Sequence, residues 1–370
     1  MRYIHELKKW PDFTWDDARL AALLAEVRHR QGWLLGRLEG LGFRFREEAT
    51  LATLTEEVVK SSAIEGEKLD VKSVRSSIAR HLGLDADSTK PRDRHVEGIV
   101  EMMLDATRNC RAKLTTERLF GWHSCLFPTG RSGMHKISIG KWRTDATGAM
   151  QVVSGAMGRE RVHFEAPVAK RLASEMKRFL AWFARLDVDP VLAAGIAHFW
   201  FITIHSFDDG NGRIARAIAE MALSRADGVT EKFYSMSAQI ERERKDYYRR
   251  LEASQRSSTL DITDWLEWFL QCLVRAIERS QKTLDAVLQR AKFWEQFGRS
   301  VKGSLNERQR KVLGRLLDGF DGKLSTAKYA RLAKCSHDTA LRDIKVLLDI
   351  GAMRQSTAAG RSTSYELCVK

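Results

Sequence analysis

The most apolar stretch of the chain runs from Val191 to Ile204 and stops at a polar loop. It is shorter than the roughly 20 residues that cross a bilayer, and it contains His198. We therefore predict a helix buried in a globular core, and no membrane partner.

The chain has 370 residues, of which 44% are hydrophobic, and one hydrophobic core rarely accommodates a chain of that length. Two or three domains are expected.

Helical periodicity dominates the rest of the sequence. Prolines number only five, and apolar side chains recur at helical spacing, as at Leu20, Leu23 and Val27. Thr14 ahead of Asp17 is typical of a helix start. The chain is therefore predicted to be mainly α. Further helices are expected over about 51–66, 168–186, 191–204, 213–226, 265–297, 307–317 and 337–351.

The pattern changes between Gly140 and Pro167. There the β-branched and aromatic residues Val152, Val162 and Phe164 lie on either side of a glycine-containing segment, Ser154 to Gly158. Such an arrangement is typical of a β-hairpin, which would stand alone among helices.

Charge and cysteine content narrow the choice of partners. The formal net charge of +14 favours a polyanion, which could be nucleic acid or the phosphates of a nucleotide. The cysteines number five and form no CxxC pair, so neither a disulfide framework nor a metal site is predicted. Because no stretch resembles a secretory signal, the cytoplasm is the expected location.

The loop after the apolar stretch, His205 to Arg216, concentrates chemically useful side chains. Gly210 and Gly212 allow the backbone to turn tightly and approach a ligand, and the start of the following helix offers N–H groups to an anion. Arg213 and Arg216 are three residues apart, so both guanidinium groups lie near that helix start. The loop is therefore predicted to bind a polyphosphate.

Two other side chains of the loop suit phosphate chemistry. Asp209 can hold Mg²⁺, which prefers one or two carboxylates together with the phosphates of a substrate. His205 titrates near neutrality and can deprotonate an incoming hydroxyl. Each residue type is common in ordinary turns, but the combination is rare. We therefore interpret this loop as a catalytic centre rather than as a surface turn.

The loop resembles the signature of the Fic family, HxFx(D/E)GNGRxxR. The matching residues are His205, Phe207, Asp209, Gly210, Asn211, Gly212, Arg213 and Arg216. Fic enzymes mostly attach AMP to Ser, Thr or Tyr hydroxyls, so the resemblance implies a protein adenylyltransferase with ATP as substrate and Mg²⁺ as cofactor. It implies these roles: His205 as general base, Asp209 as magnesium ligand, Gly210 to Gly212 as the site of the α- and β-phosphates, Asn211 as a phosphate and loop-shaping contact, Arg213 as a phosphate contact, and Arg216 as the γ-phosphate ligand.

The same resemblance extends beyond the loop. Phe207 would anchor the loop in the core, whereas Ser206 replaces a common proline and would leave the loop entry less rigid. The hairpin over about 151–164 resembles the Fic flap, which holds a target segment by strand pairing. Tyr247 and Tyr248 resemble the region that lines the adenine side of the nucleotide pocket, although an aromatic pair on a helix also suits core packing.

An upstream segment resembles the inhibitory motif (S/T)xxxE(G/N) of Fic proteins. Ser61, Glu65 and Gly66 match it. If Gly66 ends a helix, Glu65 lies at the negative end of the helix dipole and needs a cationic partner. The resemblance names Arg216 as that partner, so the ion pair would compete with the γ-phosphate of ATP.

The C-terminal segment is predicted to be a winged helix. A short turn at 334–336 separates two helical stretches, and residues 353–367 read as a two-stranded wing. From Leu305 to Lys370 there are thirteen Lys and Arg residues against seven Asp and Glu. DNA binding is one interpretation, through Thr339, Arg342, Lys345 and Arg361. A protein-docking or dimerisation module is the other.

Together these predictions describe three parts. They are a helical region over 1–100 with the inhibitory motif, a helical Fic core over 101–297 with a β-hairpin flap, and a winged helix-turn-helix domain over 305–370. The predicted reaction transfers AMP to a hydroxyl of a target protein, or of the chain itself, under inhibition by Glu65. The alternatives are removal of AMP by the same site, transfer of another nucleotide or phosphate group, and a DNA-binding regulator that senses a nucleotide. A homodimer is also among the expected assemblies.

Overall fold

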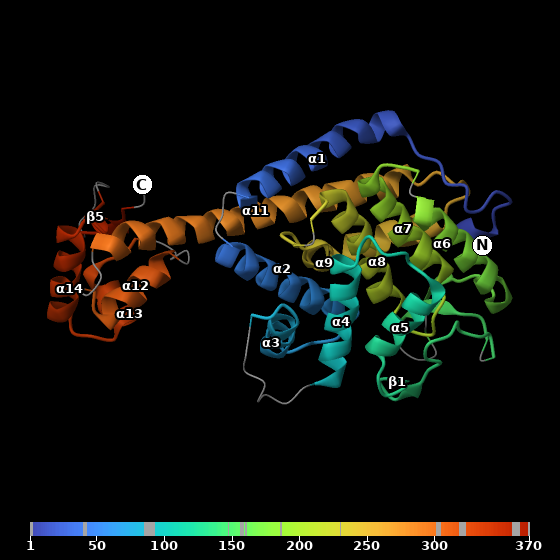
Figure 1. The fold of residues 1–370 in the computed structure, drawn as a ribbon, viewed down its shortest axis with the longest axis horizontal. Helices are drawn as coiled ribbons and strands as arrows, with labels where there is room; N and C mark the ends of the chain where they lie inside the picture. Colours follow the sequence, from blue (N-terminus) through green and yellow to red (C-terminus); the bar gives the residue numbers. More distant parts are fainter. Residues whose placement is uncertain are drawn as a thin grey trace. The chain divides into compact units, whose positions relative to one another are not determined.

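The computed structural model describes residues 3–39, 43–84, 93–146, 148–155, 159, 161–185, 187–229, 231–300, 305–317, 323–356 and 363–368. Across these residues the chain is mainly helical, as predicted (Figure 1). By its contacts it divides into two compact units, Met1–Ser280 and Gln281–Lys370. No helix among the described residues is long and apolar enough to span a membrane.

The first unit is built from helices and two short hairpins. Its helices are α1 (Asp17–Glu39), α2 (Phe43–Ile64), α3 (Val71–His81), α4 (Arg94–Arg108), α5 (Thr116–Leu126), α6 (Leu172–Arg185), α7 (Pro190–Ile204), α8 (Asn211–Asp227), α9 (Met236–Arg242), α10 (Arg244–Gln255) and the start of α11 (Thr263–Ser300). The hairpins pair β1 (Arg131–Ser132) with β2 (His135–Lys136) and β3 (Gln151–Ser154) with β4 (Arg161–Glu165), both antiparallel. The β3–β4 hairpin was predicted, and the much shorter β1–β2 hairpin was not.

Several helix boundaries differ from the prediction, as two long helices show. Helix α2 begins at Phe43 rather than near Leu51, because charged and aromatic residues without a turn former precede the apolar stripe. Helix α11 continues to Ser300, past the expected end at Phe297, so the first residues of the predicted linker are helical.

Helix α7 is the centre of the core, and every residue from Val191 to Ile204 is buried. It packs closely on α11, where the Trp265 Nε1 donates a hydrogen bond to the Gly195 carbonyl at 2.9 Å. A β-carbon on Gly195 would meet the Leu266 side chain at 2.9 Å, so only glycine permits this approach. The prediction of a buried core helix is confirmed.

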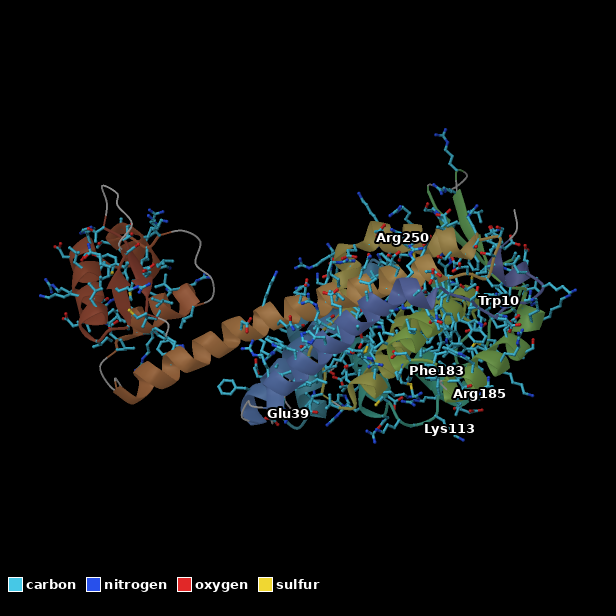
Figure 2. All side chains as sticks on the ribbon, turned by 90° about the horizontal axis from the view of Figure 1, so that it is seen from above. Trp10, Glu39, Lys113, Phe183, Arg185 and Arg250 are labelled. Carbon is cyan, nitrogen blue, oxygen red and sulfur yellow. The ribbon has the colours of Figure 1, made fainter. Side chains whose placement is uncertain are left out.

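Helix α1 lies beside the first half of α11 and runs in the same direction (Figures 1 and 2). Arg19 pairs with Asp264 near the start of both helices, and Arg30 pairs with Glu278 further along. The N-terminal segment therefore covers the core from outside through surface ion pairs, while Leu20, Val27 and Leu34 face inward and are buried.

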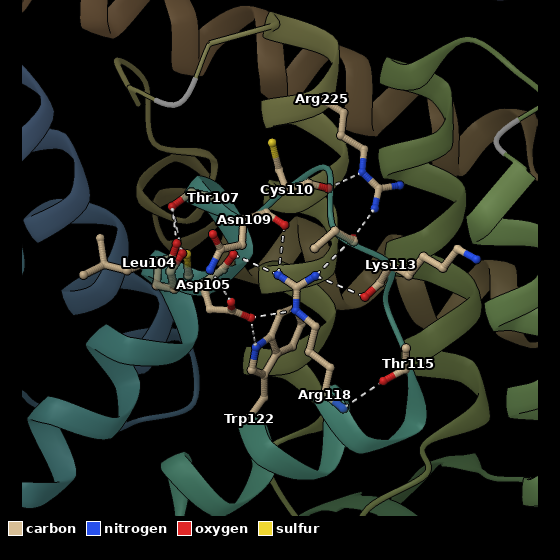
Figure 3. A network of polar contacts seen from close by, with 12 residues as sticks. Leu104, Asp105, Thr107, Asn109, Cys110, Lys113, Thr115, Arg118, Trp122 and Arg225 are labelled. Carbon is tan, nitrogen blue, oxygen red and sulfur yellow. Dashed lines mark hydrogen bonds and ion pairs between the residues drawn. The ribbon is translucent and has the colours of Figure 1, made fainter.

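A polar network fastens α4, α5 and the end of α8 together (Figure 3). The Asp105 carboxylate accepts hydrogen bonds from Arg118 Nε at 2.6 Å and Trp122 Nε1 at 2.7 Å. Arg118 also donates to the backbone carbonyls of the α4–α5 turn, and Arg225 of α8 donates to the same turn. This network holds α8, whose first turn forms the site, against the α4–α5 pair.

Over its described residues the second unit contains the end of α11, three further helices and a hairpin. The further elements are α12 (Glu307–Leu317), α13 (Thr326–Ala333), α14 (His337–Asp349) and the antiparallel strands β5 (Met353–Gln355) and β6 (Tyr365–Leu367). Its core contains Val312, Leu313, Tyr329, Ile344 and Leu347. Arg342 and Lys345 are exposed on α14, Thr339 is half-buried, and Arg361 lies outside the described residues. DNA binding by this unit stays a prediction.

Candidate active site

The predicted catalytic loop joins the two central helices. Helix α7 ends at His205, which adopts a left-handed conformation with φ 52°. Gly210 then caps the start of α8 with φ 82°, and a β-carbon there would also meet the Phe127 ring at 2.9 Å. Glycine is therefore required at position 210 on two grounds, the backbone angle and the contact with the ring.

Asn211 holds the loop in shape. Its Oδ1 accepts a hydrogen bond from the Phe207 N–H at 3.0 Å, and its Nδ2 donates to the Phe207 carbonyl at 2.8 Å. Phe207 is fully buried and stacks on His123 with 4.2 Å between ring centroids. Because both ends of the Asn211 amide bind the Phe207 backbone, its place here is that of a loop-shaping residue.

Asn211→Ala is therefore expected to lower the free energy of unfolding by about 2–4 kcal/mol, because two buried backbone groups lose their partners. Urea denaturation followed by circular dichroism measures the change. Asn211→Asp keeps the acceptor and loses the donor, so it should fall between the parent and the alanine variant. Equal stability of Asn211→Ala and the parent would contradict this role.

His205 is oriented by two backbone contacts. Its Nδ1 lies 3.2 Å from the Ile202 carbonyl oxygen, which can only accept, so Nδ1 carries the proton and Nε2 keeps its lone pair. Its own carbonyl accepts from Arg143 Nε at 2.7 Å. Burial, with a smaller contribution from the Arg143 charge, lowers the pKa of His205 to about 4, although the Ile202 carbonyl and the charges of Glu65 and Asp209 oppose the shift. The ring is therefore a neutral base over the whole neutral range.

Asp209, the predicted magnesium ligand, follows Asp208 in the same loop and is half-buried. One of its oxygens accepts a hydrogen bond from the Ser132 hydroxyl, and its backbone carbonyl lies 3.2 Å from His123 Nε2. No cluster of three or more His, Cys, Asp or Glu side chains suited to a metal occurs among the described residues. A single carboxylate fits Mg²⁺ only when substrate phosphates complete the coordination.

Arg216 is buried and is engaged by the inhibitory segment predicted from the sequence. Its Nη2 lies 2.8 Å from Glu65 Oε1, its Nε donates to the Ser61 hydroxyl at 2.9 Å, and Nη2 donates to the Ser61 carbonyl at 2.8 Å. A β-carbon on Gly212 would lie 2.0 Å from Glu65 Oε1. The Glu65 carboxylate therefore rests directly on the first turn of α8, where an anion is favoured.

Arg213 has an acidic partner of its own. Its Nη1 lies 2.9 Å from Glu67 Oε2, and its guanidinium lies 5.0 Å from the centre of the Phe127 ring. The other Glu67 oxygen contacts His95 Nε2. The Glu67 side chain thus joins α8 to α4.

The two predicted tyrosines, Tyr247 and Tyr248, lie on α10, near the charges of Arg216 and Glu65. Tyr247 is buried, and its hydroxyl lies 2.9 Å from His198 Nε2. The Tyr248 hydroxyl donates to the Ile64 carbonyl at 3.4 Å. Tyr248 therefore contacts the last residue of α2. A role of the Tyr247 or Tyr248 ring beside adenine stays a prediction.

The β3–β4 hairpin is pinned to the same helix. His163 of β4 contacts Glu252 of α10 through Nδ1 at 2.7 Å and Ser154 of β3 through Nε2 at 2.6 Å. Arg256 donates to the Val162 carbonyl at 2.7 Å and the His163 carbonyl at 2.9 Å. Helix α10 and its C-terminal cap Arg256 therefore hold β4, and His163 links β4 to β3.

The structure thus brings together every residue expected at the nucleotide site, apart from the open question of the tyrosine pair. Other residues that the sequence did not predict also contact the site, among them Ser132, His95, Arg143 and Glu67. Only Glu67 left a local signal, since a second carboxylate two residues after Glu65 follows the same glycine turn. The others come from segments whose approach to α8 depends on the tertiary fold.

Residues 113–223 match the model described as the Fic/DOC family, and residues 3–84 match a domain of unknown function, DUF4172. Protein adenylyltransferase Fic of Nematostella vectensis is 29% identical over 117 residues, which cover 30% of this chain and 25% of that protein. Protein adenylyltransferase fic-1 of Caenorhabditis elegans is 27% identical over 96 residues, covering 25% of this chain and 18% of that protein. The matches therefore span a quarter or less of these relatives.

Solved structures extend the similarity in fold. A Fic family protein from Desulfovibrio desulfuricans aligns over 97% of this chain and 98% of its own, with a TM-score of 0.53 and 21% identity. A Fic domain containing signaling protein from Bacteroides thetaiotaomicron aligns over 70% of this chain and 94% of its own, with a TM-score of 0.50 and 18% identity. Residues 113–223 of the chain therefore carry a domain of the Fic/DOC family.

Proposed function

We propose that this protein transfers AMP from ATP to a hydroxyl side chain of a target protein. The observation that carries the proposal is the pair of buried arginines at the start of α8, beside a neutral histidine. Arg216 Nη1 and Arg213 Nε are both buried and have no hydrogen-bond partner among the described residues. Buried guanidinium donors of this kind suit the oxygens of a polyphosphate.

The reaction follows from the protonation state of His205. Its Nε2 accepts the proton of a target hydroxyl, whose oxygen then forms a bond to the α-phosphorus of ATP. The bond from the α-phosphorus to the bridging oxygen breaks, and pyrophosphate leaves. Arg213 and Arg216 neutralise the phosphate charge, so catalysis is mainly positioning and electrostatic stabilisation. Mg²⁺, bound by Asp209 and the phosphates, would add charge neutralisation.

Regulation of this site belongs to the same proposal. In the observed geometry Glu65 and Ser61 occupy Nη2 and Nε of Arg216, which leaves only Nη1 for a phosphate. We infer that Glu65 inhibits the enzyme and that ATP must displace its carboxylate. The β3–β4 hairpin would hold the target segment, since α10 holds β4 in place and His163 links β4 to β3.

The test uses ATP labelled at one phosphate at a time. With the Glu65→Gly protein, label at the α position should become protein-bound in cell lysate or on the chain itself, and label at the γ position should not. Acid-stable label from the γ position alone would mean phosphate transfer and would overturn the proposal. Loss of α-label from an already modified protein, with no new incorporation, would favour AMP removal instead.

A further inference from the structure

Two carboxylates, not one, occupy the arginines at the start of α8. Glu65 pairs with Arg216, and Glu67 pairs with Arg213 at 2.9 Å. Gly66 lies between the two glutamates with φ 85°. Its left-handed turn lets Glu67 N–H return to the Ser62 carbonyl at 3.1 Å. One tight turn thus directs two acidic side chains onto one helix terminus.

We propose that Glu67 is a second inhibitory residue, which competes with nucleotide phosphate for Arg213, and that His95 holds it in place. This inference rests on the proposed nucleotide site, and it adds a residue outside the motif that pointed to Glu65.

The position of Arg213 makes Glu67 a competitor rather than a surface partner. The Arg213 side chain is only 6% exposed, whereas that of Glu67 is 30% exposed. Phe127 lies against the guanidinium and restricts its movement away from the helix start. An anion that approaches Arg213 therefore meets the Glu67 carboxylate first, and that carboxylate has the freer side chain of the two.

His95 makes the second contact with the Glu67 carboxylate. The two Glu67 oxygens have separate partners, Arg213 on α8 and His95 near the start of α4. His95 also has its backbone N–H bonded to Asp93 at 2.9 Å, which orients the first turn of α4. Release of Glu67 from Arg213 alone would leave its carboxylate held by His95.

Protonation of His95 and engagement of Glu67 favour each other. The hydrogen bond to Glu67 raises the pKa of His95, although burial and Arg213 oppose the rise and Asp93 supports it. On the neighbouring helix α3, Arg80 and His81 are paired with Glu97 instead. The raised pKa means that protonation of His95 stabilises its pair with Glu67. Inhibition by Glu67 is therefore complete below the pKa of His95 and weakens as pH rises through it.

The experiment measures binding of MgATP by calorimetry, with every protein in a His205→Ala background so that no turnover occurs. The variants are Glu67→Gln, Glu65→Gly and both together. Glu67→Gln should lower the Kd about 5- to 30-fold, within the range usual for coupled sites, and the double variant should bind more tightly than either single variant. Glu48→Gln is the matched control, because it breaks an exposed ion pair between Glu48 of α2 and Arg75 of α3 and should leave Kd unchanged.

The outcomes separate this inference from the proposed reaction. An unchanged or higher Kd for Glu67→Gln, whether Glu65 is present or replaced, would overturn it, provided that thermal unfolding shows the variant folded. A lower Kd supports it even if no protein ever becomes labelled, in which case only the transfer of AMP fails. The ratio of parent to Glu67→Gln Kd should be larger at pH 6 than at pH 8.5, and a ratio equal at both would exclude the role of His95.

Discussion

Glu65→Gly is expected to raise the rate of AMP transfer on the order of 5- to 150-fold over the parent at subsaturating ATP, the usual range for a coupling free energy between competing groups. The reason is geometric. Removing the carboxylate leaves Arg216 Nη2 bonded to the Ser61 carbonyl alone and clears the space above Gly212, where Glu65 Oε1 now rests. Incorporation of α-labelled AMP per unit time, as a function of ATP concentration, measures the effect.

A second variant separates the effect of removing the Glu65 charge from the effect of placing a glycine at position 65. Glu65→Gln keeps the side-chain volume and removes the charge, so it should also activate, though less than glycine. The KM for ATP should fall in both variants, because the lost group competes with substrate. Equal rates for Glu65→Gly and the parent, at low and saturating ATP alike, would contradict inhibition by Glu65.

His205→Ala, introduced into the Glu65→Gly protein, is expected to reduce AMP transfer by about 10²- to 10⁴-fold, which is the usual contribution of a general base. Nucleotide binding should persist, because His205 makes no hydrogen bond to Arg213, Arg216 or the α8 N-terminus among the described residues. The expected pattern is therefore a fall in kcat at nearly unchanged Kd for ATP.

His198→Ala serves as a comparison, since His198 is a buried histidine on the same helix whose partner is Tyr247. It should reduce stability, whereas His205→Ala should leave the unfolding temperature close to that of the parent. If transfer continued at the same rate without His205, the base would have to be another group, and the mechanism proposed for this site would be wrong.

Local patterns predicted the helices well where the chain carries its own end signals. Helix α12 begins and ends where expected, and α7 differs by one residue. Each boundary is set by residues adjacent in sequence, such as Asp189, which caps α7 through the Val191 N–H. The start of α2 was missed because periodicity defines a buried face but gives no information on how far a helix continues beyond it.

The residues of the candidate site also differ in whether the local sequence predicts them. Gly210, Asn211 and the two arginines could be predicted, because the loop makes most of its own bonds, as between Asn211 and Phe207. Of the acidic partners of those arginines, Glu65 could be predicted by its resemblance to the inhibitory motif, whereas Glu67 could not be predicted. Charge complementarity across 146 residues of sequence separation leaves no periodic trace, and it becomes visible only when α2 and α8 are packed together.

Gly212 has a consequence for how such an enzyme can change. A side chain at this position would exclude the carboxylate of Glu65, but it would equally obstruct a phosphate at the same helix turn. Phosphate and the Glu65 carboxylate would therefore share one steric requirement at position 212, where a side chain would exclude both. The segment that delivers the carboxylates, residues 61–67, is where sensitivity to inhibition could change separately. A lineage could gain or lose restraint there without altering its catalytic helix.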